Sequence, residues 1–430
     1  MSEITTVGQS VQGGVETVPG TRVPANLRFQ SLGFDIGIMA DIKKYTPKGA
    51  KYPSLAVKGK EWTDVALTGE ITYTEAPVPL AMALGKPLVT PLDSGAAFQY
   101  DFESKTYKPD TLLTLTLEQG SSVRAKRVTN ATLDKLHFKW SRDSATAEIS
   151  GDLFANPLED GVQLTGAGSN EKQTLTAGGS TAGVVTFTGN GQTVDVAYPT
   201  TADGVGEALE TLYGSGNVIV SGPDGFGPFV VEFAGTLAGT TPALLTATST
   251  GSAVTIAQTT AATVGVEPTL FDLVPATAEH VAVYADDLSS SFGTTLLERV
   301  LDVEILIGNR QGPLWALNRF LKGFAATVEK ASDFEVKLLV EADEDGMALG
   351  LGTMRKGATK YIRVEAVGDP IVGSTHNSSI TFDLPMKVAA IAKEKDQGGV
   401  FAYEITFTVV HDKAFGRSNK VSVVTGQRSI

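Results

Sequence analysis

The sequence predicts a mainly β protein: two tandem β-sandwich or barrel domains, each with a short helix, and a small β-rich module with one helix inserted between them. Three observations lead to this prediction. Apolar and polar residues alternate along many segments, short phrases recur in the same order in both halves, and the composition changes abruptly near Gly161 and Gly265. A period of two is typical of strands with one buried and one wetted face. The expected domains are 1–160, 161–266 and 267–430.

Composition limits the class of protein. The chain has 430 residues, of which 42% are hydrophobic and 19% charged, with no cysteine and a formal net charge of −13. This is enough apolar material for two or three packed cores, and it does not fit a disordered chain. The absence of cysteine excludes disulfide scaffolds, cysteine-ligated metals and thiol catalysis. An acidic chain is also poorly suited to gripping nucleic acid, which requires clustered lysine and arginine.

The amino-terminal segment and the apolar runs predict a soluble protein. The first residues, MSEITTVGQSVQGG, contain no basic segment followed by an apolar one. No uncharged apolar run approaches the roughly 18 residues that a membrane helix needs. We therefore expect neither a secretory signal nor membrane insertion by this chain.

The central segment differs in composition from both flanks. It has a single base, Lys172, no arginine, and turn-rich borders. A change of composition at both ends indicates an inserted module. Its acidic residues are Glu171, Asp195, Asp203, Glu207, Glu210, Asp224 and Glu232.

Within this module the pattern predicts strands around one helix. Gly183–Thr188 and Thr193–Tyr198 are rich in β-branched residues, and Gly189-Asn-Gly191 between them is a hairpin signal. Apolar residues at helical spacing predict a helix over Thr201–Leu212 that ends at Gly214. Further strands are expected at Asn217–Val220, Phe229–Phe233 and Ala253–Ala257.

The two flanks look like each other. Lys58-Gly59 begins 24 residues before Met82-Ala-Leu-Gly85, and Lys322-Gly323 begins 25 residues before Met347-Ala-Leu-Gly350. Such matches, in the same order and at nearly the same spacing, predict an internal duplication. The alternative is two unrelated β domains.

Further elements repeat in the same order. Ala147-Glu-Ile-Ser150 matches Tyr403-Glu-Ile-Thr406, and the strands before them are expected at Thr132–Trp140 and Ser379–Ala389. Each copy should also contain one short helical piece. These pieces are expected at Pro79–Leu84 and Glu344–Met354.

One strand in each copy has two chemically different faces. Alignment from the MALG end places Glu70 on Glu335. Alternate side chains of a strand point to opposite sides of the sheet, so each strand divides into two sets. The core-face candidates are Val65, Leu67, Ile71, Tyr73, Phe334, Val336, Leu338 and Val340. The candidates for the opposite face are Asp64, Thr68, Glu70, Thr72, Asp333, Glu335, Lys337 and Glu341.

Catalytic and metal motifs are not apparent. Glu341–Gly352 imitates a calcium loop, but position twelve is glycine instead of a bidentate carboxylate, and an acidic helix start is the alternative. The four histidines are far apart, and His137 falls on the polar face of a strand. We therefore expect no cofactor, no metal and no enzymatic activity.

The phrases of both copies resemble one family. NRQGPLWALN (309–318), the stretch from 334 to 368, and YEITFTVVHDKAFG (403–416) resemble the major tail tube proteins of bacteriophages with long, non-contractile tails. TVPGTRVPANLRF (17–29) and residues 51–75 resemble the amino-terminal half of the same proteins. The segment 170–265 is similar to a module that recurs in phage tail and virion proteins.

This resemblance implies a structural virion protein, made in the host cytoplasm, that polymerises into stacked rings around a channel for DNA. The expected partners are further copies of itself, the tape measure protein, and the tail terminator and baseplate proteins. Double-stranded DNA would pass non-specifically. The exposed-face candidates would then line the lumen, where acidic and hydroxyl side chains avoid binding phosphate.

Two other classes stay open from the sequence: a virion-surface or extracellular adhesin made of β domains, and a hydrolase with scattered carboxylates. Family tube rings are six-fold, so a duplicated chain predicts a homotrimer with pseudo-six-fold symmetry. The central module is expected on the tube exterior, because a lumen that passes a duplex has no room for it.

Overall fold

The computed structural model describes residues 9–121, 124–142, 146–166, 170–237, 240–262, 268–317 and 323–430. They form a mainly β protein with several antiparallel sheets, 53% of it strand. The chain divides into two compact units: Met1–Val162 with Thr269–Ile430, and Gln163–Pro268. The two expected copies therefore lie in one unit, the larger one. Lys322, from the first repeated phrase of copy two, lies outside the described residues.

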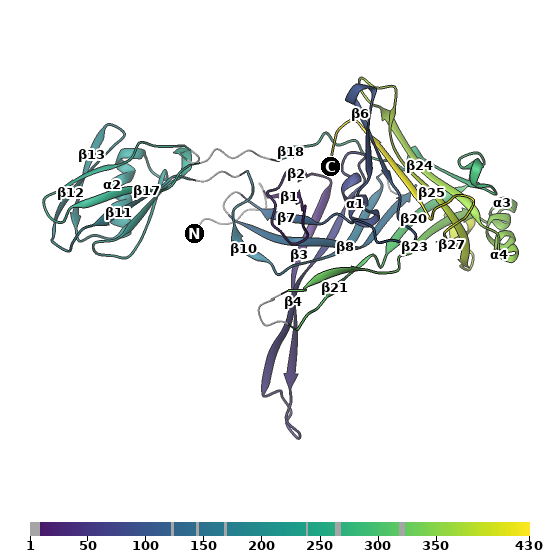
Figure 1. Cartoon of the computed structure of the whole chain (residues 1–430), viewed down its shortest axis with the longest axis horizontal. Coiled ribbons are helices and arrows are strands. Elements are labelled where there is room, and N and C mark those ends of the chain that lie inside the picture. The colour runs from purple at the N-terminus through teal and green to yellow at the C-terminus, as the bar shows by residue number, and fades with distance from the viewer. Residues whose placement is uncertain are drawn as a thin grey trace. The chain divides into compact units, whose positions relative to one another are not determined.

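Eight strands of the larger unit form one continuous antiparallel sheet (Figure 1). The order across it is β3–β4–β9–β8–β20–β23–β27–β25. The first four strands are β3 (Leu32–Tyr45), β4 (Leu55–Glu70), β9 (Glu148–Ala155) and β8 (Ala125–Ser141). The other four are β20 (Val300–Gly308), β23 (Asp333–Glu341), β27 (Val400–Val409) and β25 (Asn377–Ile391).

The two halves of this sheet have the same topology. In each quartet the first two strands in the chain are neighbours, and the last strand lies between the second and the third. Strand β8 of the first quartet pairs with β20 of the second, from Leu136↔Ile307 to Ser141↔Asp302. Two quartets with the same order, joined edge to edge, are the arrangement that an internal duplication predicts.

Shorter strands extend the long ones. The amino-terminal half of β8 pairs with β7 (Leu115–Gly120) and β10 (Glu159–Val162). The amino-terminal half of β25 pairs in the same way with β24 (Lys360–Pro370) and β28 (Lys420–Thr425). The remaining strands are β1 (Ser10–Val15), β2 (Leu27–Phe29), β5 (Leu88–Leu92), β6 (Ala97–Phe102), β18 (Thr269–Leu270), β19 (Val281–Asp286), β21 (Gln311–Leu314), β22 (Ala326–Glu329) and β26 (Lys395–Gln397).

Helices occupy matching places in the two halves. Helix α1 (Pro77–Leu84) follows β4, and every one of its residues is buried. Helix α3 (Glu344–Met347) follows β23 and continues through a π-helical turn (Ala348–Gly352) into α4 (Thr353–Lys356). Both predicted helical pieces are confirmed. Asp343 caps α3 by accepting a hydrogen bond from the Gly346 backbone N–H at 2.8 Å, which is the role of an acidic helix start.

The larger unit has one core shared by both halves. Residues such as Leu67, Phe138, Val336 and Phe407 belong to the same buried apolar cluster. All eight core-face candidates are buried, with exposed fractions of 6% or less. The two copies consequently fold as one body with a common interior, and neither has a separate core.

The smaller unit has its own core around helix α2 (Ala202–Tyr213). Thr201 caps the helix and Gly214 follows it with a positive φ of 88°, so the predicted helix is confirmed. Asn190 and Gly191 both have positive φ, as a tight hairpin turn requires. The strands are β11 (Lys172–Ala177), β12 (Gly183–Gly189), β13 (Gln192–Tyr198), β14 (Val218–Ser221), β15 (Phe229–Phe233), β16 (Thr246–Ser249) and β17 (Val254–Thr260), of which β11 and β16 were not predicted.

Candidate functional site

The exposed face of the eight-stranded sheet brings together the predicted exposed-face residues of both copies. Asp64, Thr68 and Glu70 on β4 are exposed, and so is Asp333 on β23. Glu335, Lys337 and Glu341 are half-buried on the same side of β23. Because directly opposed residues share a face, the sheet register carries this face from one quartet to the other.

Thr72 does not belong to this face, and its placement there was wrong. Strand β4 ends at Glu70, and Thr72 is only 3% exposed. Its Oγ1 accepts a hydrogen bond from the Glu75 backbone N–H at 3.2 Å, and its backbone bridges to Pro275. The alternation fails here because the chain leaves the strand and turns toward helix α1.

Glu70 and Glu335 are not at equivalent positions either. Glu70 lies opposite Glu148, whereas Ser150 lies opposite Thr68 and its match Thr406 lies opposite Lys337. The strand pairing thus makes Thr68 equivalent to Lys337, whereas the alignment based on MALG makes it equivalent to Asp333. The two alignments differ by four residues, or about 13 Å along a strand. The connection from strand to helix explains the shift: it spans 71–76 in copy one but only 342–343 in copy two.

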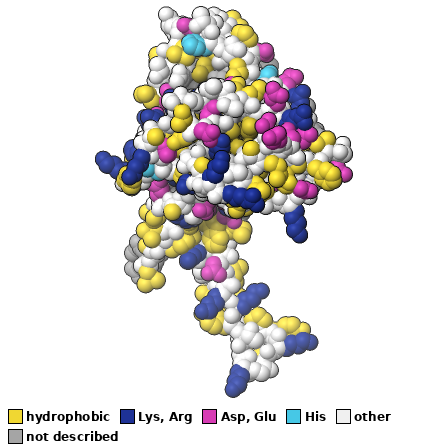
Figure 2. Space-filling view, turned by 90° about the vertical axis from the view of Figure 1, so that its right-hand side faces the viewer, with side chains coloured by type: hydrophobic (Ala, Val, Ile, Leu, Met, Phe, Trp, Pro, Cys, Tyr) yellow, Lys and Arg dark blue, Asp and Glu magenta, His cyan; other side chains and the backbone are white. Residues whose placement is uncertain are grey.

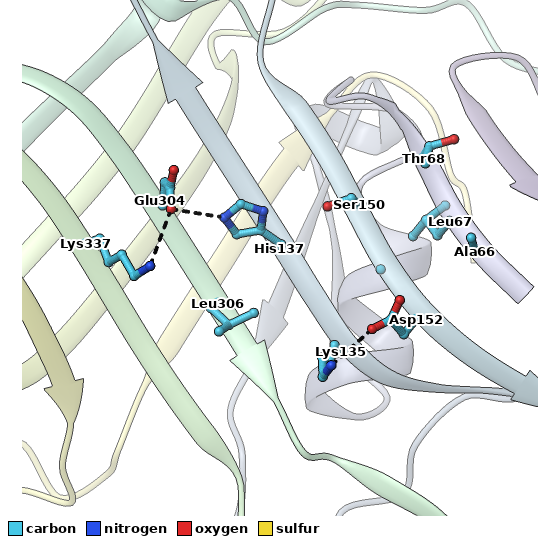
Figure 3. Close-up of a pocket in the computed structure, with 11 residues that line it drawn as sticks. Ala66, Leu67, Thr68, Lys135, His137, Ser150, Asp152, Glu304, Leu306 and Lys337 are labelled. Carbon is cyan, nitrogen blue, oxygen red and sulfur yellow. Dashed lines mark hydrogen bonds and ion pairs between the residues drawn. The ribbon is translucent and has the colours of Figure 1, made fainter.

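Charges of both signs meet across the strands of this face. One row runs Glu70, Glu148, Lys139, Glu304, Lys337 and Thr406, each opposite the next. Glu304 is the centre of the row, and its carboxylate lies 3.4 Å from Lys139 Nζ. It also lies 3.6 Å from His137 Nε2 and 3.9 Å from Lys337 Nζ, the two partners drawn in Figure 3. The face is therefore not uniformly acidic, because much of its charge is paired.

Glu304 was missed by the sequence reasoning, although a signal was present. Val303, Ile305 and Ile307 are buried while Glu304 and Leu306 are half-buried, so β20 alternates like the other strands. A shallow pocket of about 400 Å³ lies beside this strand, and Glu304, Leu306, His137 and Lys337 contribute to its lining. Lys135 and Asp152 form a further ion pair at 3.2 Å in the same pocket (Figure 3).

The ion pairs of this face add little to stability. They are partly exposed and contribute less than about 1 kcal/mol each. Among the described residues, no group of three or more His, Asp or Glu side chains could hold a metal ion. Nor is any helix in the described part of the chain long and apolar enough to cross a membrane.

Both ends of the eight-stranded sheet have a free edge. Among the described residues, β3 pairs with β4 alone. At the other end, residues 387–391 of β25 pair with β27 on one side, whereas β24 covers the opposite side only up to Met386. Strand β26 continues this edge, because it pairs with β27 beyond β25. Exposed edges of this length are places where another chain can add a strand.

A second exposed feature is the arm, which we define as residues 42–58. It is the distal part of the β3–β4 hairpin, beyond a register shift between Ala40 and Ile42, and it projects from the rest of the larger unit (Figure 1). The arm contains five lysines and no acidic residue, although the whole chain has a net charge of −13. Its large apolar residues are all exposed: Ile42, Tyr45, Tyr52, Leu55 and Val57.

No family model matches the chain, and no curated protein matches it.

Proposed function

We propose that the chain is a structural virion protein that polymerises into stacked rings and forms the tail tube of a bacteriophage with a long, non-contractile tail. In this proposal three chains form a ring with pseudo-six-fold symmetry, and the exposed face of the eight-stranded sheet lines a channel for DNA. The observation that carries the proposal is the sheet itself. Two quartets of the same order are already joined edge to edge, and both outer edges are free.

The pairing of β8 with β20 inside the chain is the model for the proposed pairing between chains. If β25 of one copy pairs with β3 of the next as β8 pairs with β20, three copies make a closed ring of β strands. Closure would satisfy both free edges, which a lone sheet must otherwise protect. The charges suit this pairing, because Lys387 and Lys395 lie near one edge and Asp35 near the other.

The chemistry of the exposed face is compatible with a channel. Its lysines lie opposite carboxylates, which reduces their capacity to neutralise phosphates. DNA passing such a wall would release few bound counterions and would therefore not be held. The tape measure, tail terminator and baseplate proteins remain proposed partners on the basis of the resemblance.

Cysteine cross-linking tests the ring, because the wild-type chain contains no cysteine. Inside the chain, Leu306 on β20 lies opposite His137 on β8. When Thr406 is matched to Ser150, the equivalent positions on the two outer strands are Asp35 on β3 and Ala390 on β25. The same pairing between chains therefore places Asp35 opposite Ala390 of the next copy. The double variant Asp35→Cys/Ala390→Cys should form interchain disulfides on oxidation, giving covalent trimers in denaturing gels. Asp35→Cys/Lys395→Cys is the matched control and should cross-link poorly.

Negative-stain microscopy and native mass measurement complete the test. Tubes or rings with three chains per ring are expected. Dispersed monomers at high concentration, or rings of six chains, would contradict the proposed assembly.

A further inference from the structure

We infer that the arm docks on a second copy of this chain, in an acidic groove beside helix α3; this inference rests on the proposed self-assembly. The acidic groove is a pocket of about 560 Å³ in the second half of the larger unit. Its carboxylates are Asp287, Glu298, Glu341, Asp343 and Asp345.

The arm needs a partner for physical reasons. Within the described residues, its strands pair only with each other. A two-stranded hairpin is marginally stable in water unless a further layer covers it. Opposed pairs place Tyr45, Leu55 and Val57 on one face of the arm, each of them 45–56% exposed. Lys43 shares this face, and its Nζ lies 5.6 Å from the centre of the Tyr45 ring.

The groove complements that face in charge. Three cations line it together with the five carboxylates: Arg299, Lys356 and Lys360. Arg299 pairs with Glu341 at 2.8 Å and Lys360 pairs with Asp287 at 2.7 Å. Among the described residues, Glu298 and Asp345 have no ion pair, and Asp345 is exposed. The groove therefore keeps unpaired negative charge for lysines of the arm.

The groove also complements the arm in apolar surface. Leu296 lines the groove and is 50% exposed. Leu288 (62%), Met347 (38%) and Met354 (46%) are also exposed, and each is next in sequence to a lining residue. Figure 2 faces the side on which Figure 1 labels α3 and α4, and there magenta acidic and yellow apolar side chains lie next to one another. The same view shows dark blue lysines along the projecting hairpin.

A contact between two different surfaces of identical chains is heterologous, so it propagates from copy to copy. The second half has a hairpin of its own in the matching place, because β21 and β22 pair between β20 and β23. The sequence 313–327 contains two basic residues, against the five lysines of the arm. A trimeric ring would thus present three arms and three grooves.

Photo-cross-linking tests where the arm lies. A benzoylphenylalanine placed at Tyr45 in the full chain is irradiated in assembled tubes, and the joined peptides are identified by mass spectrometry. Cross-links to residues 287–299 or 341–356 of another chain are expected. Cross-links confined to other regions, or none in well-formed tubes, would overturn the inference while the tube proposal stands. If the wild-type chain forms no tubes, both fail.

Charge exchange gives a second readout. Lys43→Glu should raise the protein concentration needed for polymerisation by about tenfold, the equivalent of 1.4 kcal/mol. Asp345→Lys should do the same, and the double variant should recover most of the loss. Lys108→Glu makes the same charge change on an exposed loop and should have no effect. Additive losses in the double variant would overturn the assigned pairing.

Discussion

Arg310 is a buried arginine that links three segments of the larger unit. Its Nε donates to the Ala83 carbonyl at 2.6 Å, next to the end of α1, and its Nη2 donates to Asp110 at 2.9 Å. Glu329 on β22 lies 3.3 Å away. The side chains of Arg310 and Asp110 are only 6% and 4% exposed. Such a pair is costly to break, because removing the cation leaves a buried carboxylate without compensation.

We expect Arg310→Met to lower the free energy of unfolding by about 3–5 kcal/mol. Arg124→Met is the control, because Arg124 pairs with Asp160 where both side chains are about half exposed, and it should leave the free energy of unfolding almost unchanged. Urea denaturation followed by tryptophan fluorescence measures both, since Trp62, Trp140 and Trp315 all lie in the larger unit. Equal losses in the two variants would show that Arg310 does not have this structural role.

Single residues also show where sequence patterns stop being informative. All eight core-face candidates are buried, and six of them lie on β4 and β23, because burial of a strand face depends on local period. Alternation misplaced Thr72, since the end of a strand depends on where the chain turns. Alternation also could not align the two copies correctly. The extra residues in 71–76 shift the alignment by an even number of residues, so the same residues still point to the same face.

At the scale of elements, β26 and β27 form a hairpin that prolongs the free edge of β25. Lys395 Nζ lies 2.6 Å from Glu404 Oε2 across this hairpin. The hydrogen bond from Lys395 lowers the pKa of Glu404, and the same bond raises the pKa of Lys395. The pair therefore stabilises the hairpin when both groups are charged.

The pair gives the hairpin a defined pH dependence. The pKa of Glu404 is lower in the folded chain, so its stabilisation is present above the usual glutamate pKa of about 4.3 and is lost as pH falls through the lowered value. Glu404→Gln should therefore reduce stability by less than about 1 kcal/mol at pH 7 and by nothing at pH 2. Urea titrations at the two pH values measure this, and Lys395→Met should abolish the difference. An unchanged difference in the Lys395→Met background would contradict the assignment.

The elements themselves were more predictable than their partners. The helix Thr201–Leu212 and the hairpin at Asn190–Gly191 follow from caps and turn residues, which act within a few positions. The pairing of β8 with β20 joins residues more than 160 positions apart, and no local pattern encodes it. The arm, whose large apolar residues are all exposed, was missed although five lysines marked it.

At the scale of the whole molecule, the smaller unit is the part most easily separated from assembly. Residues Gln163–Pro268 have their own core, and the flanking strands β10 and β18 pair within the larger unit. Deleting Thr165–Val264 and closing the gap with a short Gly/Ser joint should leave tube formation intact. The deletion includes 167–169, 238–239 and 263–264, which lie outside the described residues. A deleted protein that keeps native tryptophan fluorescence but forms no tubes would make the module part of the ring contact.

The wall of the proposed channel allows a test on whole virions. Glu70 and Glu335 share the exposed face, but the register separates them by four residues along the strand, so each would contribute its own ring of three carboxylates. Replacing both by lysine would present six lysines in two rings to passing DNA. Lysines that neutralise phosphates release counterions, so DNA ejection should become slower, most strongly at low salt.

The competing reading is that this face points outward and only keeps the tube soluble. Asp224→Lys is the control, because it makes the same charge change in the smaller unit, at an exposed turn. Tubes and virions of all variants should form normally, and ejection kinetics are compared across a range of salt concentrations. Ejection from the Glu70→Lys/Glu335→Lys virions that matches wild type at low salt would place these strands outside the channel. A delay that disappears as salt is raised, and that Asp224→Lys lacks, would favour the lumen because only a surface in contact with DNA can respond in this way.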